Sequence, residues 1–210
     1  WPGDPIVGFS QLHCQGSGGQ PSYGIFRLGI SVSSMTVEEA HPYRFQASFP
    51  EAKLRVSIVP TAHGALYRIA SETLKPSEIV LDRKCKIAST DCINKEGLFT
   101  GNWNPNPYAC FAATEADDAA GLVRIAVSFK SQEQAEAYLR DELVGRSFDD
   151  LVAAAKAQWD AHLSRIRIEG VDEDERRRFY SHFMHTFVQP RDRTADGIGW
   201  DDHYTMWDTW

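Results

Sequence analysis

The stretch Asp172–Trp210, DEDERRRFYSHFMHTFVQPRDRTADGIGWDDHYTMWDTW, is the most informative part of the sequence. Asp172 and Asp174 occupy the places of an N-cap and a first-turn acid, which favour the start of a helix. Aromatic residues then recur at helical spacing, and Pro190 predicts the end of this helix. We therefore predict a helix from Asp172, then a polar loop and a second helix that opens near Tyr204.

The two ends of the chain both fall at unusual places. Trp1 is neither an initiator methionine nor the start of a signal peptide, and Trp210 lies within the second predicted helix. We therefore expect these 210 residues to be a piece of a longer protein.

The composition is that of an ordinary globular protein, with 42% hydrophobic and 24% charged residues. A net charge of -7 provides no basic surface and argues against nucleic acid as a partner. No apolar run approaches the roughly 20 residues that a membrane span needs.

Short apolar segments separated by glycine and proline fill the first 130 residues and predict β-strands. Apolar and polar residues alternate at 43–49 and 54–58, as in half-buried strands. Further strands are predicted at 25–30, 65–70, 78–81, 108–112 and 122–129. Such a series favours an antiparallel β-sandwich.

The hydrophobic period changes to that of helices after residue 130. Ser131 is placed as the N-cap of a helix that Gly145 ends, and Gln134 occupies its capping-box position. A second helix is predicted at 148–166, with Trp159 on its apolar face. Strands first and helices afterwards indicate the α+β class or two separate domains.

The segment Gly8–Gly19, GFSQLHCQGSGG, is the first candidate binding site. Gly16 and Gly18 let the backbone approach a ligand closely, and His13 and Ser17 add hydrogen-bonding groups. A phosphate loop is not indicated, because no glycine–lysine–serine or threonine motif follows. An ordinary surface loop remains the alternative.

The motif WDTW at the C-terminal end is the second candidate site. The ring of Trp207 can stack on the apolar face of a pyranose, while the carboxylate of Asp208 accepts hydrogen bonds from its hydroxyls. The alternative is that the tryptophan side chains belong to the core and that Asp208 is merely exposed.

The sequence assigns no metal site and no nucleophile motif to these residues. His182 and His185 are three positions apart, whereas the zincin pattern needs a spacing of four with an intervening glutamate. Cys85 and Cys92 flank a plausible turn, so one disulfide and free thiols both remain open.

Segments across almost the whole chain resemble glycoside hydrolase family 92 in their order. They are GFSQLHCQGSGG, EEAHPYRFQASF, LRVSIVPTAHGALYRI, VRIAVSFKSQEQAEAYLRDEL, IRIEG, FYSHFMHTFVQPR and YTMWDTW. The last two are fairly specific for the family, whereas the strand segments alone are not. The chain departs from the family pattern in the glycine segment, at Gln11, Leu12 and Cys14.

The resemblance implies an α+β organisation in three parts: an N-terminal antiparallel β-sandwich, a helical linker and the start of an (α/α)6 barrel. It places the sandwich at residues 1–130, the linker at 131–170 and the first, truncated elements of the barrel at 171–210.

The resemblance also implies a calcium-dependent, inverting exo-α-mannosidase that acts outside the cytoplasm: secreted, periplasmic or at the cell surface. Trp207 and Asp208 would line the subsite of the terminal mannose. Gly16, Gly18, His13 and Ser17 would help to close the pocket near the leaving sugar.

The family's catalytic acid and base, and most of its Ca²⁺ ligands, would lie beyond this chain. We therefore expect the segment alone to be inactive. The alternatives are a non-catalytic carbohydrate-binding or scaffold module and, less strongly supported, a different glycosidase with the same layout.

Overall fold

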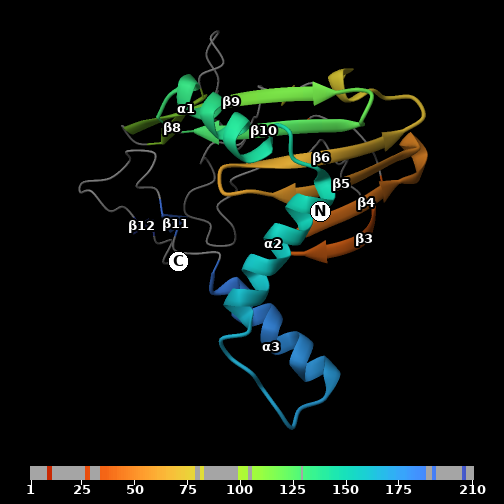
Figure 1. Cartoon of the computed structure of the whole chain (residues 1–210), viewed down its shortest axis with the longest axis vertical. Helices are drawn as coiled ribbons and strands as arrows, with labels where there is room; N and C mark the ends of the chain where they lie inside the picture. Colours follow the sequence, from red (N-terminus) through yellow and green to blue (C-terminus); the bar gives the residue numbers. More distant parts are fainter. Residues whose placement is uncertain are drawn as a thin grey trace.

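The computed structural model of the chain describes residues 9–10, 27–28, 34–78, 81–82, 99–103, 106–128, 130–187, 191–192 and 205–206. Strands dominate its first part (Figure 1). They are β1 (Phe9–Ser10), β2 (Arg27–Leu28), β3 (Thr36–His41), β4 (Arg44–Phe49), β5 (Leu54–Pro60), β6 (Gly64–Ser71), β7 (Leu81–Asp82), β8 (Phe99–Trp103), β9 (Asn106–Asp117), β10 (Leu122–Ser128), β11 (Arg191–Asp192) and β12 (Thr205–Met206).

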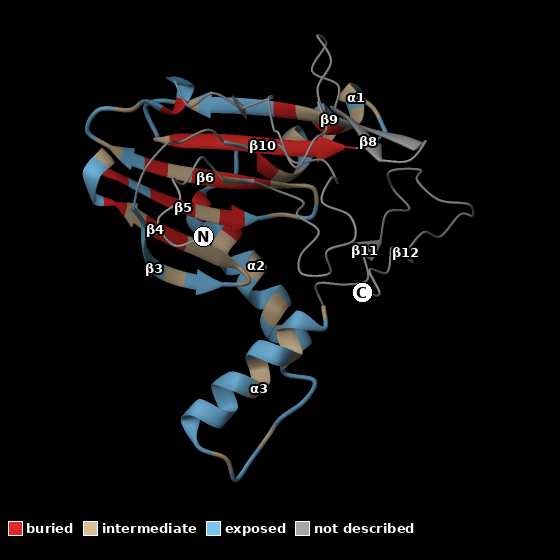
Figure 2. Cartoon of the chain, turned by 180° about the vertical axis from the view of Figure 1, so that it is seen from behind, coloured by how far each residue is buried: buried red, intermediate tan, exposed pale blue. Residues whose placement is uncertain are grey.

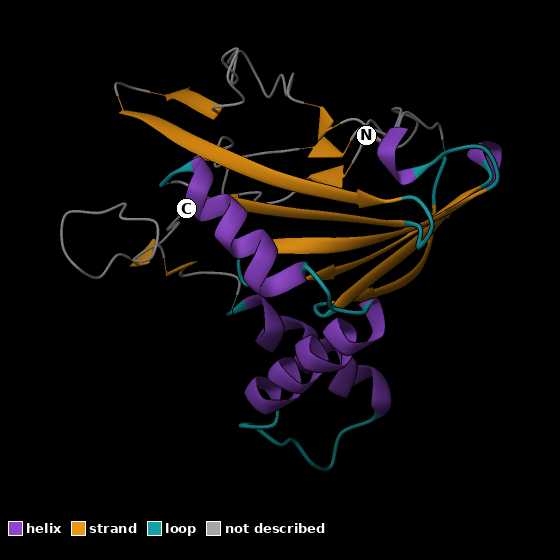
Figure 3. Ribbon diagram, turned by 45° about the horizontal axis from the view of Figure 1, so that its top comes forward, coloured by secondary structure: helices purple, strands orange, loops and turns teal. Residues whose placement is uncertain are grey.

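Helices dominate the second part (Figure 3). They are α1 (Gln132–Tyr138), the π-turn η3 (Leu139–Leu143), α2 (Phe148–Leu163) and α3 (Glu173–His185). Two short 3-10 turns, η1 (Pro50–Ala52) and η2 (Pro76–Glu78), interrupt the strands.

The main body of the fold is a seven-stranded antiparallel sheet in the order β3-β4-β5-β6-β10-β9-β8. Strands β3 to β6 form a meander of hairpins, and β10 joins β6 through the register pair Ile125↔Ala65. A second sheet has the order β1-β2-β7, and β11 pairs with β12. Strand β10 lies between β6 and β9, and all seven of its residues are buried.

One face of the large sheet packs against β1. The cross-strand pairs Phe45↔Ile58 and Ile58↔Tyr67 place these side chains on a common face, since alternate residues of a strand share a face. The Phe9 ring of β1 meets Phe45 and Tyr67 at centroid distances of 6.2 and 6.5 Å. The first strand of the small sheet thus covers this face of the large one, as in a sandwich.

The opposite face of the large sheet packs against the helices. Its core joins residues of β5, β6 and β10 to residues of the π-turn and α2 (Figure 2). The buried members are Val59, Leu66, Leu122, Ala126, Leu143, Phe148 and Leu151. The two faces of the sheet therefore carry two separate apolar layers, which explains why β10 is buried throughout.

A buried arginine ties the helical segment to the sheet. The side chain of Arg124, in β10, is only 8% exposed. Its Nε donates to the carbonyl of Leu143 at 3.1 Å, and Nη1 pairs with Glu115 at 2.8 Å. The π-turn is therefore fixed at its C-terminal end, where helical carbonyls lack partners of their own.

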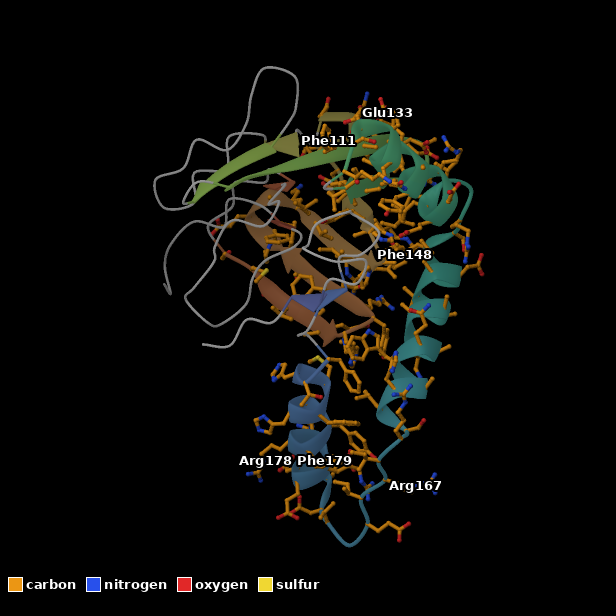
Figure 4. All side chains as sticks on the ribbon, turned by 90° about the vertical axis from the view of Figure 1, so that its left-hand side faces the viewer. Phe111, Glu133, Phe148, Arg167, Arg178 and Phe179 are labelled. Atoms are coloured by element: carbon orange, nitrogen blue, oxygen red, sulfur yellow. The ribbon has the colours of Figure 1, made fainter. Side chains whose placement is uncertain are left out.

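Helix α2 starts on the sheet and leads away from it, and α3 returns beside α2 (Figures 1 and 4). Ser147 caps α2, and the buried Phe148 ring lies under the Arg68 guanidinium at 4.2 Å. Asp172 and Glu175 form a complete capping box at the start of α3. No residue of α3 is fully buried, although Phe179 lies on its side towards α2.

The structure confirms the predicted α+β class, with an antiparallel sheet first and helices afterwards. Ser131 and Asp172 act as N-caps as predicted, and Gly145 follows the first helical segment with a φ of 74°. The domain boundaries at 130 and 170, and the assignment of residues 171–210 to a barrel, stay predictions.

Three details of the predicted secondary structure are wrong. The second helix expected near Tyr204 does not include Thr205–Met206, because these residues pair with β11 as strand β12. Helix α3 stops at His185, before Pro190, where the Thr186 hydroxyl donates to the Phe183 carbonyl at 2.7 Å. The strand expected at 78–81 begins only at Leu81, since the 3-10 turn η2 takes up residues to Glu78.

Gly64 allows β6 to approach β10 closely, and its replacement tests this packing. A Cβ at Gly64 would lie 2.2 Å from the Ile125 carbonyl oxygen, which is backbone and cannot turn aside. We expect Gly64→Ala to lower the free energy of unfolding by about 3 kcal/mol, measured by urea denaturation. The matched control is Gly145→Ala. A Cβ at Gly145 would meet open space, but the backbone there has a positive φ, so this variant should lower the free energy of unfolding by about 1 kcal/mol. Equal losses for the two variants would contradict the close approach.

Candidate functional site

The π-turn that follows α1 directs two neighbouring side chains to different places. The amide of Val144 donates to the carbonyl of Leu139 at 3.0 Å, the i to i+5 bond of a π-helix. Leu143 is thereby buried in the core, while Glu142 reaches the turn between β5 and β6. Single π-turns inserted after α-helices are frequent at functional sites.

Glu142 holds the β5–β6 turn with both carboxylate oxygens. Oε1 lies 2.5 Å from Nδ1 of His63, and Oε2 accepts from the His63 backbone amide at 3.0 Å. The ring of Tyr138 stacks on the His63 ring at a centroid distance of 3.7 Å. Burial raises the pKa of the Glu142 carboxyl, but the interactions with His63 and Thr61 together outweigh burial and bring the pKa below its usual value.

A groove of about 570 Å³ opens beside this contact between Glu142 and His63. Four segments line it: the β3–β4 turn, the β5–β6 turn, the end of the π-turn with the residues after it, and α2. The lining residues are Pro42, Pro60, Thr61, Ala62, Asp141, Glu142, Arg146, Leu151, Ala154, Ala155, Gln158 and Trp159. We call this feature the hairpin groove.

Trp159 stands at one end of the hairpin groove and also lines a smaller pocket of about 270 Å³. Its indole meets the Phe187 ring edge to face at 6.1 Å, and His162 lies 5.3 Å from Phe187. These contacts fix the indole between α2 and the end of α3.

The carboxylates that line the hairpin groove are those of Asp141 and Glu142. Both oxygens of Glu142 are already engaged by His63. Across the described ranges, no three histidine, cysteine, aspartate or glutamate side chains gather as a metal site. The described residues therefore do not fit the calcium ion that the resemblance implies.

The candidate site residues from the sequence lie outside the described part of the chain. These residues are His13, Gly16, Ser17, Gly18, Trp207 and Asp208, and the same holds for Cys85 and Cys92. Their predicted roles stay predictions. The structure describes strand β1, which precedes His13 along the chain, and strand β12, which precedes Trp207.

The hairpin groove itself was not predicted from the sequence. The one available signal was Trp159, which the helical pattern places on the apolar face of α2. The contact between His63 and Glu142 joins residues 79 positions apart, and neither stands in a recognisable motif.

Comparison with known proteins finds one family model that is similar to the C-terminal part of the chain. Residues 134–210 match the family model described as the Glycosyl hydrolase family 92 catalytic domain. No match to the chain was found among curated proteins. None of the helices in the described part of the chain combines the length and apolar character that a membrane crossing needs.

Two solved structures share the fold. The chain is similar to the family GH92 inverting mannosidase BT2199 from Bacteroides thetaiotaomicron VPI-5482, with a TM-score of 0.56 and 18% identity, covering 90% of this chain and 33% of that chain. It is also similar to the GH92 family glycosyl hydrolase ccman5, with a TM-score of 0.52 and 16% identity, covering 74% of this chain and 29% of that chain. The chain thus spans about a third of the length of these proteins, and the predicted resemblance to the family is confirmed.

The pairing of Glu142 with His63 predicts a pH-dependent contribution to stability. Because the folded-state pKa of Glu142 is below its usual 4.5, the contribution is present at neutral pH and is lost as the pH falls below 4.5. We expect Glu142→Gln to lower the free energy of unfolding by about 1 kcal/mol at pH 7, a value reduced for partial solvent exposure.

The control is the neighbouring exposed carboxylate. Asp141 pairs only at 3.7 Å with the exposed Arg140, so Asp141→Asn should change stability little at either pH. Urea unfolding at pH 7 and pH 3 measures both variants. A deficit of Glu142→Gln that is as large at pH 3 as at pH 7 would contradict this account.

Proposed function

We propose, from the confirmed resemblance to glycoside hydrolase family 92, that this chain is the N-terminal part of an enzyme that releases terminal α-linked mannose from glycans. The match of residues 134–210 to the family's catalytic domain carries this proposal. These residues include most of α1, the π-turn, α2 and α3, which follow the sheet directly along the chain. A mannosidase with the same fold supports mannose as the sugar.

The proposed enzyme requires residues beyond this chain. An inverting glycosidase places two carboxyl groups about 6.5–9.5 Å apart, with a water between one of them and the sugar. We assign neither group to these 210 residues and propose that both follow in the complete protein. The isolated chain is then inactive on its own.

Trp207 and Asp208 are our proposed contacts to the terminal mannose, through ring stacking and hydrogen bonds to hydroxyls. The segment with His13, Gly16, Ser17 and Gly18 is proposed to close the pocket near the leaving sugar. One observation supports an anchored start of this segment. Phe9, just before it, packs against Phe49 at 5.8 Å and against two further aromatic rings of the large sheet.

We further propose that the activity depends on Ca²⁺ and that the enzyme works outside the cytoplasm: secreted, periplasmic or at the cell surface. Calcium is a hard cation that takes six to eight oxygen ligands. Since the described residues offer no such set, its ligands belong to other parts of the protein.

A non-catalytic carbohydrate-binding or scaffold module is the second candidate function. The observation that favours it is the hairpin groove, which presents an indole and polar side chains in the described part of the chain. Under this alternative, mannosides bind but are not hydrolysed.

Mannose release by the complete gene product tests the proposal. We expect the purified protein to liberate mannose from an α-linked mannobiose, and a calcium chelator to abolish the release. Trp207→Ala and Asp208→Asn should each lower kcat/KM by at least a hundredfold, because contacts to the terminal sugar also stabilise the transition state.

The control variant is Glu72→Gln, an exposed residue whose ion pair with Lys53 lies on the sheet. It should leave the rate unchanged. Proton NMR of the first product would show β-mannose if the mechanism inverts. A folded complete protein that binds mannobiose without releasing mannose would refute the enzyme and favour the binding module.

A further inference from the structure

We propose that the hairpin groove is a binding site for a neutral, mannose-containing oligosaccharide, with Trp159 as the stacking platform. The choice of mannose rests on the proposed function, whereas the choice of a neutral sugar rests on the side chains of the groove. The volume of about 570 Å³ lies within the range of roughly 300–1,000 Å³ that is typical of small-molecule sites.

The walls of the groove are held in place by the contacts of the fold. The β5–β6 turn is tied to Glu142 through two bonds of 2.5 and 3.0 Å to His63. The π-turn is tied to the sheet by Arg124, which donates to the Leu143 carbonyl at 3.1 Å. A groove fixed in this way needs little reorganisation when a ligand binds, which lowers the cost of association.

The floor of the groove is apolar and open because α2 presents small residues there. Ala155 lies one turn before Trp159 on α2, Ala154 lies one turn before Gln158, and all four residues line the groove. Pro42 and Pro60 form the facing wall from the two hairpin turns, and proline has no amide hydrogen that would need a partner. Flat apolar surfaces of this kind match the C–H faces of pyranose rings.

Polar groups stand along this apolar floor with their hydrogen-bonding capacity unused. The side chains of Arg146 and Gln158 line the groove and form no hydrogen bond or ion pair with any other described residue. Together they supply guanidinium donors and an amide with both donors and an acceptor, which suits the hydroxyls of a sugar.

The charges of the groove favour a neutral ligand. One cationic side chain, Arg146, lines the groove together with the carboxylates of Asp141 and Glu142, and both oxygens of Glu142 are already engaged by His63. The ring of Trp159 is held edge to face against Phe187 at 6.1 Å, so its orientation is set before a ligand arrives. An indole fixed beside balanced polar groups is the arrangement that stacks on a sugar and orients its hydroxyls.

Isothermal titration of the 210-residue chain with α-linked mannobiose tests the site. We expect one binding site in the wild-type chain and at least a tenfold weaker Kd for Trp159→Ala. Arg146→Ala and Gln158→Ala should each weaken binding about threefold to tenfold. Both side chains are exposed, so these two variants decide the question even if Trp159→Ala fails to fold.

The control variant is Arg140→Ala, an exposed arginine of the π-turn that does not line the groove. It should bind mannobiose as the wild type does. No heat of binding at millimolar mannobiose, or binding that all three groove variants leave unchanged, would overturn the proposal. Failure of mannose release by the complete protein, with groove binding intact, would refute the enzyme but not the groove.

Discussion

The buried guanidinium of Arg124 joins the two halves of this chain. Arg124 belongs to β10, on the face of the sheet that packs against the helices, and donates to the last carbonyl of the π-turn. An unpaired charge in this position would cost several kcal/mol, so Glu115 and the Leu143 carbonyl must both stay in place. This contact, together with the buried Leu143 and Phe148 side chains, holds the end of the π-turn and the start of α2 against the sheet.

The helical arm beyond the sheet has a different character from the body of the fold. Helix α3 has a complete capping box, yet none of its residues is fully buried. Its Phe179 and Phe183 form a chain of ring contacts with Phe187, which follows the helix. Arg178 and the other charged residues of its first two turns are exposed (Figure 4). Local signals thus establish this helix, whereas the sheet is established by packing between distant residues.

The parts of the fold that were predictable from the sequence are those with local causes. Ser131 and Asp172 are capping residues whose partners lie three positions away, and both act as N-caps. Alternation along β4 and β5 predicted one buried face, but Gln46 and Ser57 on the predicted polar side are also buried, because the sheet is covered on both faces. The sequence could not predict the pairing of Glu142 with His63, because it depends on an extra residue in the π-turn and on a contact across 79 positions. The same holds for β12, which exists only through its pairing with Arg191–Asp192.

Amide hydrogen exchange of the 210-residue chain tests the central claim that the π-turn and the sheet form one cooperative unit. The account predicts that amides of β6, β10, α1 and the π-turn exchange with a common, high protection, whereas those of α3 exchange much faster. It also predicts that Arg124→Ala removes protection from α1 and the π-turn before it removes protection from β6. Exchange of α1 and the π-turn as fast as that of α3 in the wild-type chain would contradict it.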